Sequence, residues 1–66
     1  MDEYILQFFD YAHLPPHLAA VSAPFCDMAH RLVKEHQPNP ERSETLRKLL
    51  EAKDCAVRSY LLTHKR

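Results

Sequence analysis

The chain contains no glycine, so its five prolines are the main indication of where it turns. Proline fixes φ and lacks an amide N–H, which suits turns and the first turn of a helix but disrupts helix interiors. The prolines lie at positions 15, 16, 24, 38 and 40. The Pro15-Pro16 pair separates a short N-terminal segment, and Pro38 with Pro40 marks a tight connection between two longer segments. We therefore expect three segments within a single domain over residues 1–66.

The segment 40–63 is predicted to be a helix. Two acid–base pairs spaced four residues apart, Glu44 with Lys48 and Asp54 with Arg58, support it because the acid precedes the base in each. Apolar residues recur at steps of three and four along one face. They are Leu46, Leu49, Leu50, Ala56, Val57, Tyr60 and Leu61. A helix of this length is about 36 Å long.

The segment 17–36 shows the same helical spacing of apolar residues. They are Leu18, Val21, Phe25, Met28, Ala29, Leu32 and Val33. Pro24 lies inside this pattern, and the sequence leaves two outcomes open. Pro24 either kinks the helix or marks its true start, with Ser22 as the capping residue.

The fold class expected is all-α: an antiparallel helical hairpin with a short N-terminal segment, assembled as a homo-oligomer. The short connection near 37–39 requires the two long helices to lie antiparallel. The apolar segment 2–9 favours a further helix of two turns, which needs a partner surface to be stable. Two helices cannot cover each other's apolar faces fully, so we expect the remaining apolar surface to pack against another copy.

Composition excludes several classes of protein. Nine basic and nine acidic residues give a net charge of zero, which argues against a protein that binds duplex nucleic acid. No apolar run approaches 18 residues, so no membrane span is expected. Residues 1–3 are not a basic region ahead of an apolar stretch, so no signal peptide is expected. Cys26 and Cys55 are expected to be reduced thiols.

The residue pattern gives little support for a metal site or for catalysis. His13 with His17 and Cys26 with His30 have helical spacing and could in principle form a four-ligand zinc site. The prolines between the first pair weaken this alternative, and we expect no metal and no cofactor. A 66-residue hairpin offers little cavity for a cysteine–histidine pair, so we expect no enzymatic activity.

The start of the last helix carries the residues best suited to an anion. Asn39 can cap the helix and Pro40 suits its first turn, and a helix N-terminus attracts phosphate through its free N–H groups. Side-chain donors follow within two turns, and arginine binds phosphate with two donors in a fixed fork. These donors are Arg42, Ser43, Arg47 and Lys48. Upstream, the flat ring of Tyr11 could stack on a base.

Two stretches of the sequence resemble a known family. They are Phe9-Asp10-Tyr11-Ala12-His13 followed by Pro15-Pro16, and Pro38-Asn39-Pro40-Glu41-Arg42-Ser43-Glu44-Thr45-Leu46-Arg47-Lys48-Leu49-Leu50-Glu51-Ala52. Together they resemble the helical-hairpin domain of small phage proteins that sequester cyclic nucleotides, the anti-CBASS and anti-Thoeris sponges. The resemblance covers most of residues 9–58.

The resemblance implies a symmetric oligomer, such as a hexamer, that binds cyclic di- or trinucleotides between subunits in the host bacterial cytoplasm without cleaving them. By position, Tyr11 would stack on a base, and His13 and Pro15 would shape the same pocket. Ser43 and the nearby arginines would lie where phosphates bind. The family's phosphate-binding lysine on the first long helix is replaced here by Pro24 or Cys26. The alternative function is a non-catalytic helical module that binds another protein through its apolar faces.

Overall fold

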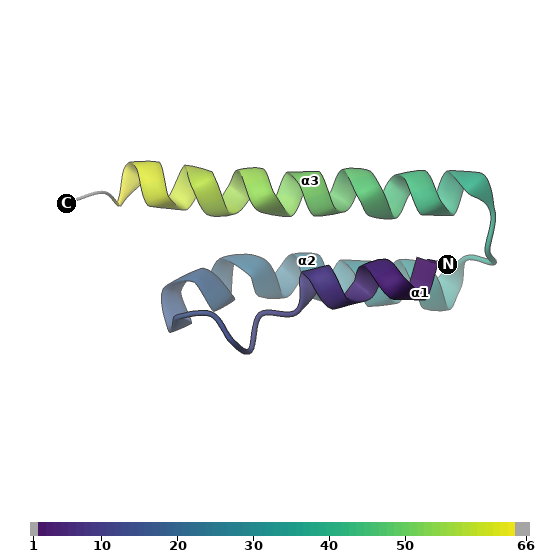
Figure 1. Ribbon diagram of the computed structural model, residues 1–66, viewed down its shortest axis with the longest axis horizontal. Helices are drawn as coiled ribbons and strands as arrows, with labels where there is room; N and C mark the ends of the chain where they lie inside the picture. The colour runs from purple at the N-terminus through teal and green to yellow at the C-terminus, as the bar shows by residue number, and fades with distance from the viewer. Residues whose placement is uncertain (1, 65–66) are drawn as a thin grey trace.

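The computed structural model describes residues 2–64 of the chain as four consecutive helical elements. These are α1 (Asp2–Ile5), the 3₁₀ turn η1 (Leu6–Phe9), α2 (Pro16–Glu35) and α3 (Pro40–Thr63). The two long helices lie antiparallel, and α1 with η1 runs alongside them (Figure 1). The molecule is elongated, with extents of 43 × 19 × 16 Å. The predicted all-α hairpin with a short N-terminal segment is therefore confirmed within the protomer.

Local capping explains where the long helices begin. Pro40 is the first residue of α3, and Asn39 before it accepts a hydrogen bond from the backbone N–H of Arg42 at 2.8 Å. α2 likewise begins at a proline, Pro16, and the carbonyl of Pro15 accepts from the N–H of Ala19 at 2.8 Å. The predicted range 40–63 matches α3, and 17–36 differs from α2 by one residue at each end.

Pro24 does not start α2, because α2 continues through it from Pro16 to Glu35. The ring of Pro24 cannot donate to the carbonyl of Ala20, four residues before it. Both residues are exposed. Water can therefore solvate the freed carbonyl, which lowers the cost of keeping a proline inside the helix. Ser22, the predicted alternative cap, is instead buried in the helix interior at 1% exposure.

The N-terminal segment is one α-helical turn followed by one 3₁₀ turn, rather than the regular two-turn helix predicted over 2–9. It contacts both long helices and supplies Phe9, which is fully buried. The buried apolar core consists of Phe9, Cys26, Ala29 and Leu46. Cys26 and Ala29 are small, which lets the large Phe9 ring enter beside α2.

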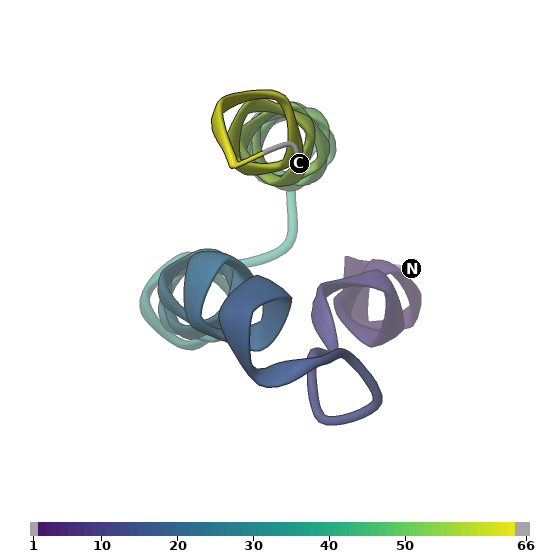
Figure 2. The ribbon, with the colours of Figure 1, turned by 90° about the vertical axis from the view of Figure 1, so that its left-hand side faces the viewer.

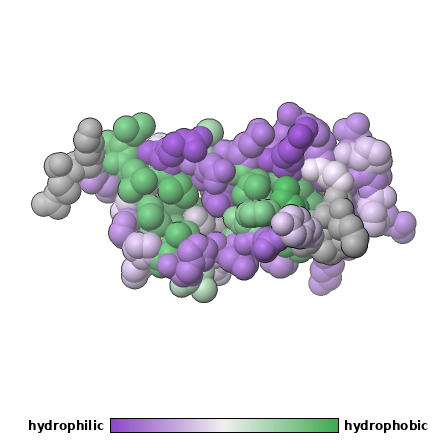
Figure 3. All heavy atoms as spheres, viewed as in Figure 1, coloured by the Kyte–Doolittle hydropathy of each residue, from purple (hydrophilic) through white to green (hydrophobic). Residues whose placement is uncertain are grey.

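The N-terminal segment covers only one side of the hairpin. Viewed along the helices, it packs against one side of the α2–α3 pair, and the opposite side has no third element from residues 2–64 (Figure 2). Apolar side chains are also visible at the surface over the end of α3 and the start of α2 (Figure 3). Among the residues whose side chains the structure describes, the exposed large apolar ones are Tyr4, Phe8, Met28, Leu61 and Leu62. No helix among the described residues is both long and apolar enough to cross a membrane.

Candidate functional site

The first turn of α3 has its N–H groups largely committed to the chain itself. The Asn39 side chain accepts from the N–H of Arg42 at 2.8 Å and donates to the carbonyl of Gln37 at 2.8 Å. The backbone carbonyl of Asn39 accepts from the N–H of Ser43 at 3.2 Å. The predicted cap is therefore formed, and the asparagine oxygen occupies the place where an anion would otherwise meet the helix end.

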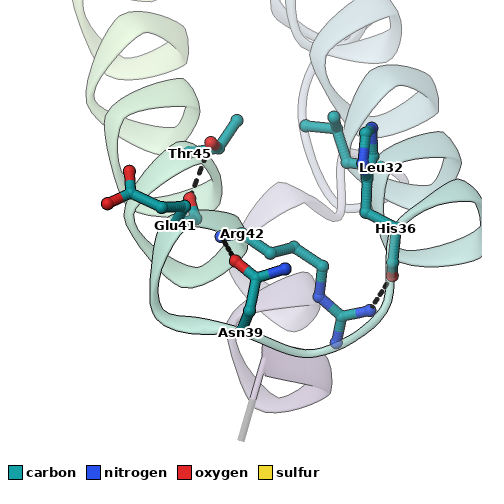
Figure 4. Close-up of a pocket in the computed structure, with 6 residues that line it drawn as sticks. All are labelled: Leu32, His36, Asn39, Glu41, Arg42 and Thr45. Atoms are coloured by element: carbon teal, nitrogen blue, oxygen red, sulfur yellow. Dashed lines mark hydrogen bonds between the residues drawn. The ribbon is translucent and has the colours of Figure 1, made fainter.

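Arg42 is directed into the protomer, although the sequence placed it among the phosphate ligands. Arg42 is only 5% exposed, and its Nη1 donates to the carbonyl of Val33 at 3.1 Å. The same nitrogen donates to the carbonyl of His36 at 2.5 Å (Figure 4). These carbonyls lie in and just after the last turn of α2, where main-chain acceptors lack helical partners. The guanidinium thus joins the end of α2 to the start of α3, because Nη1 carries two N–H donors and can serve two acceptors at once.

Two exposed cations of α3, Arg47 and Lys48, gather around one carboxylate. Arg47 donates through Nη2 to both carboxylate oxygens of Glu44, at 2.7 and 2.8 Å. Lys48 lies with its Nζ 3.3 Å from the same carboxylate, which confirms the predicted Glu44–Lys48 pair. The hydrogen bond from Arg47, then that from Lys48, lowers the pKa of Glu44, and Glu44 raises the pKa of Arg47. Glu44, Arg47 and Lys48 together carry one net positive charge, and the carboxylate of Glu51 also acts on Arg47 and raises its pKa further.

Ser43 and Arg47 are four residues apart, so they lie one above the other on the same side of α3. Both are exposed. Arg42 and Arg47 are five residues apart and diverge around the helix. One arginine therefore faces the end of α2 and the other faces solvent. The second predicted ion pair is not formed: Asp54 contacts the Nζ of Lys53 at 3.2 Å, and Arg58 contacts the sulfur of Cys55 at 3.2 Å.

The other half of the predicted site belongs to the connection between η1 and α2. Tyr11 is half-buried and packs against the apolar core, whereas His13 and Pro15 are exposed. The carbonyl of Tyr11 accepts from the N–H of Leu14 at 3.0 Å, which closes a turn. This connection leads toward the end of the hairpin where α2 starts, and α3 starts at the opposite end (Figure 1). The two halves of the predicted site are therefore carried by separate parts of the protomer.

A notch of about 230 Å³ lies where α2 meets α3, and sequence reasoning identified only part of it. Its lining residues are Leu32, His36, Asn39, Glu41, Arg42 and Thr45. The hydroxyl of Thr45 donates to the carbonyl of Glu41 at 2.8 Å, so it is already committed within α3. The boundary signal at Asn39-Pro40 locates the turn in the sequence. It does not show which neighbouring side chains converge there.

The four residues of the zinc alternative do not form a site. Cys26 is buried, and its pKa is raised by desolvation and, to a lesser extent, by the charges of Asp10 and Asp27. His17 lies against the ring of Tyr60 instead, with centroids 5.7 Å apart. Among residues 2–64, no group of three or more histidine, cysteine, aspartate or glutamate side chains is placed to hold a metal ion. The two cysteines do not form a disulfide.

No protein-family model matches the chain, and no curated protein or solved structure is significantly similar to it.

Proposed function

We propose that this chain is a phage anti-defence protein that binds cyclic di- or trinucleotides in the host bacterial cytoplasm and sequesters them without cleaving them. The observation that carries the proposal is the exposed cationic cluster on α3. Both bonds from Arg47 to Glu44 use Nη2, so its Nε and Nη1 can serve a phosphate. Lys48 adds a second charge and Ser43 a hydroxyl on the exposed surface of α3.

The binding mode combines this cluster with the connection before α2. Tyr11 packs against the core but remains partly exposed, so its ring is held in place while part of its surface can meet a base. His13 and Pro15 border the ring in sequence and are exposed. Arg42 acts indirectly in this proposal, by fixing the turn from which α3 and its cationic cluster project. Because the two halves lie on separate parts of a protomer, we propose that a homo-oligomer, such as a hexamer, completes each pocket.

Native mass spectrometry of the purified protein with a panel of cyclic di- and trinucleotides tests the proposal. An oligomer that retains unmodified nucleotide in stoichiometric amounts is the expected result. Arg47→Glu should weaken retention at least tenfold, because it reverses the charge that faces the phosphate. Arg31→Glu is the matched control, since Arg31 also pairs with a carboxylate on an exposed helix surface, that of Glu35 at 3.1 Å. Equal loss in both variants, or no retention by the wild type, would contradict the proposal.

A second candidate function is a non-catalytic module that binds another protein, and the exposed apolar residues favour it. Tyr4 and Phe8 form an edge-to-face pair on the N-terminal segment, with centroids 5.8 Å apart, and are 68% and 49% exposed. A protein partner would make binding depend on such residues rather than on Arg47. Comparing Phe8→Ser with Arg47→Glu in a pull-down from infected cells separates the two functions.

A further inference from the structure

On the side of the hairpin away from the N-terminal segment, which no third element among residues 2–64 covers, helical geometry places one row of α2 side chains beside one row of α3 side chains. We call the surface between these two rows the groove. Two contacts between the helices locate its ends. At one end Leu32 and Thr45 line the same notch, and at the other His17 lies against Tyr60. Helical steps of three and four residues connect these ends along each helix. The row on α2 is His17, Val21, Phe25, Met28 and Leu32, and the row on α3 is Thr45, Leu49, Ala52, Ala56 and Tyr60.

The groove is apolar, and its two walls differ in size. Neither row contains an aspartate, glutamate, lysine or arginine. The contacts of Arg42 with His36 and of Tyr60 with His17 fix the antiparallel register. In that register the large Phe25 on α2 is level with the small Ala52 on α3. At this level the α2 side of the groove therefore projects and the α3 side is recessed.

The accessible surface area of the chain can be compared with that of a compact monomer of the same mass. The difference indicates how much surface a further interface could bury. Its accessible surface is 4950 Å² for a mass of 7.7 kDa. A compact monomer of this mass exposes about 4,300 Å² by the scaling of surface with mass. The excess is about 600 Å², close to the roughly 800 Å² that each partner buries in a standard protein interface. One further interface of ordinary size would therefore remove the excess.

We propose that a second copy of this chain covers the groove with its own groove, about a two-fold axis parallel to the helices. This rotation places α2 of each copy against α3 of the other at the same level. The Phe25 ring of one copy then meets the second copy's Ala52, and the reverse contact occurs by symmetry. The result is a four-helix bundle in which every adjacent pair of helices is antiparallel.

This interface specifies part of the oligomer on which the proposed function rests. It lies apart from Ser43 and Arg47, whereas Lys48 borders it, three residues after Thr45 and four before Ala52. Ser43 and Arg47 flank Thr45 in sequence at two residues on either side, so helical geometry turns them away from the Thr45 row. Packing of the grooves thus leaves the Ser43–Arg47 side of α3 open. The alternative occupant of the groove is a different protein. Its binding would not require Phe25 and Ala52 to lie at the same level along the two helices.

Sedimentation equilibrium of the full chain without nucleotide tests the interface. The wild type should have a mass that is an even multiple of 7.7 kDa. Ala52→Glu and Met28→Glu should each raise the dissociation constant on the order of 100-fold or more, because each places an unpaired charge in the contact. Ala20→Glu and Cys55→Glu are matched controls on the same helices, at exposed positions outside the rows, and should retain the wild-type mass.

Circular dichroism on the same samples shows whether each variant is folded. A monomeric wild type would overturn the interface, and so would a folded Ala52→Glu variant with unchanged mass. The readout needs no ligand. A wild-type dimer that retains no cyclic nucleotide would therefore contradict the proposed function alone. A monomer that binds nucleotide would contradict the interface and the pocket shared between copies, but not nucleotide binding itself.

Discussion

Replacing Arg42 by methionine should destabilise the hairpin severely, although the residue lies in the first turn of a surface helix. Methionine keeps a long buried stem but removes the donors that reach the carbonyls of Val33 and His36. A hydrogen bond from a charged group contributes about 1.5–3 kcal/mol. Water at the turn can replace part of each bond, so the loss for two bonds should be about 3 kcal/mol.

That loss is large for a chain of this size. A domain of 66 residues has a free energy of unfolding of roughly 3–10 kcal/mol. A change of about 3 kcal/mol should lower the melting temperature by roughly 12–24 °C, from the usual entropy of unfolding of small domains. Arg42→Lys should recover only part of the loss, because its ammonium ends a flexible stem and loses more side-chain freedom for each hydrogen bond that it forms.

Thermal and urea unfolding followed by circular dichroism provides the measurement, at one protomer concentration for all variants because oligomers unfold in a concentration-dependent way. Arg31→Met serves as the control, since its ion pair with Glu35 is exposed and should contribute under about 1 kcal/mol. The reasoning is refuted if Arg42→Met unfolds within error of Arg31→Met. Full stability in Arg42→Lys would show that a lysine ammonium serves the two carbonyls as well as Nη1 of Arg42 does.

Three further predictions concern pH, thiol reactivity and the open end of the hairpin. Because the pKa of Glu44 is lowered in the folded chain, its contribution to stability should be present above its unfolded pKa and be lost as pH falls through the folded value; Glu44→Gln should flatten that part of the stability–pH curve. Cys26 is buried and Cys55 is exposed, so Cys55 should react rapidly with a thiol reagent and Cys26 only as fast as the chain opens; equal rates for both thiols would contradict this. Burial also raises the pKa of the Cys26 thiol, so the stability of the fold should fall at alkaline pH, where the thiol of the unfolded chain ionises first. Tyr60 stacks on His64 with ring centroids 3.8 Å apart, so Tyr60→Ala should speed amide hydrogen exchange in the last turns of α3. Unchanged exchange rates would show that the stack does not stabilise this end of the helix.

Short-range chemistry made much of the fold predictable. The residues at 39 and 40 cap and start α3 through bonds that reach no further than three or four positions, so the boundary could be identified without knowledge of the rest of the chain. The same holds for the Glu44–Lys48 pair, whose geometry is fixed by one turn of helix. Apolar spacing identified both long helices, and the short connection between them required a hairpin.

The sequence by itself determined where the long helices lie and which residues around Asn39 form a cap, because these depend on neighbours within one helical turn. Only the tertiary structure decided that Arg42 faces inward while Arg47 faces solvent, since that depends on where the last carbonyls of α2 come to rest. It also decided that Pro24 lies in an unbroken helix, because a proline is tolerated only where its lost partner carbonyl can meet water. Both features depend on residues that are distant in sequence, and no local sequence pattern indicates where those residues lie.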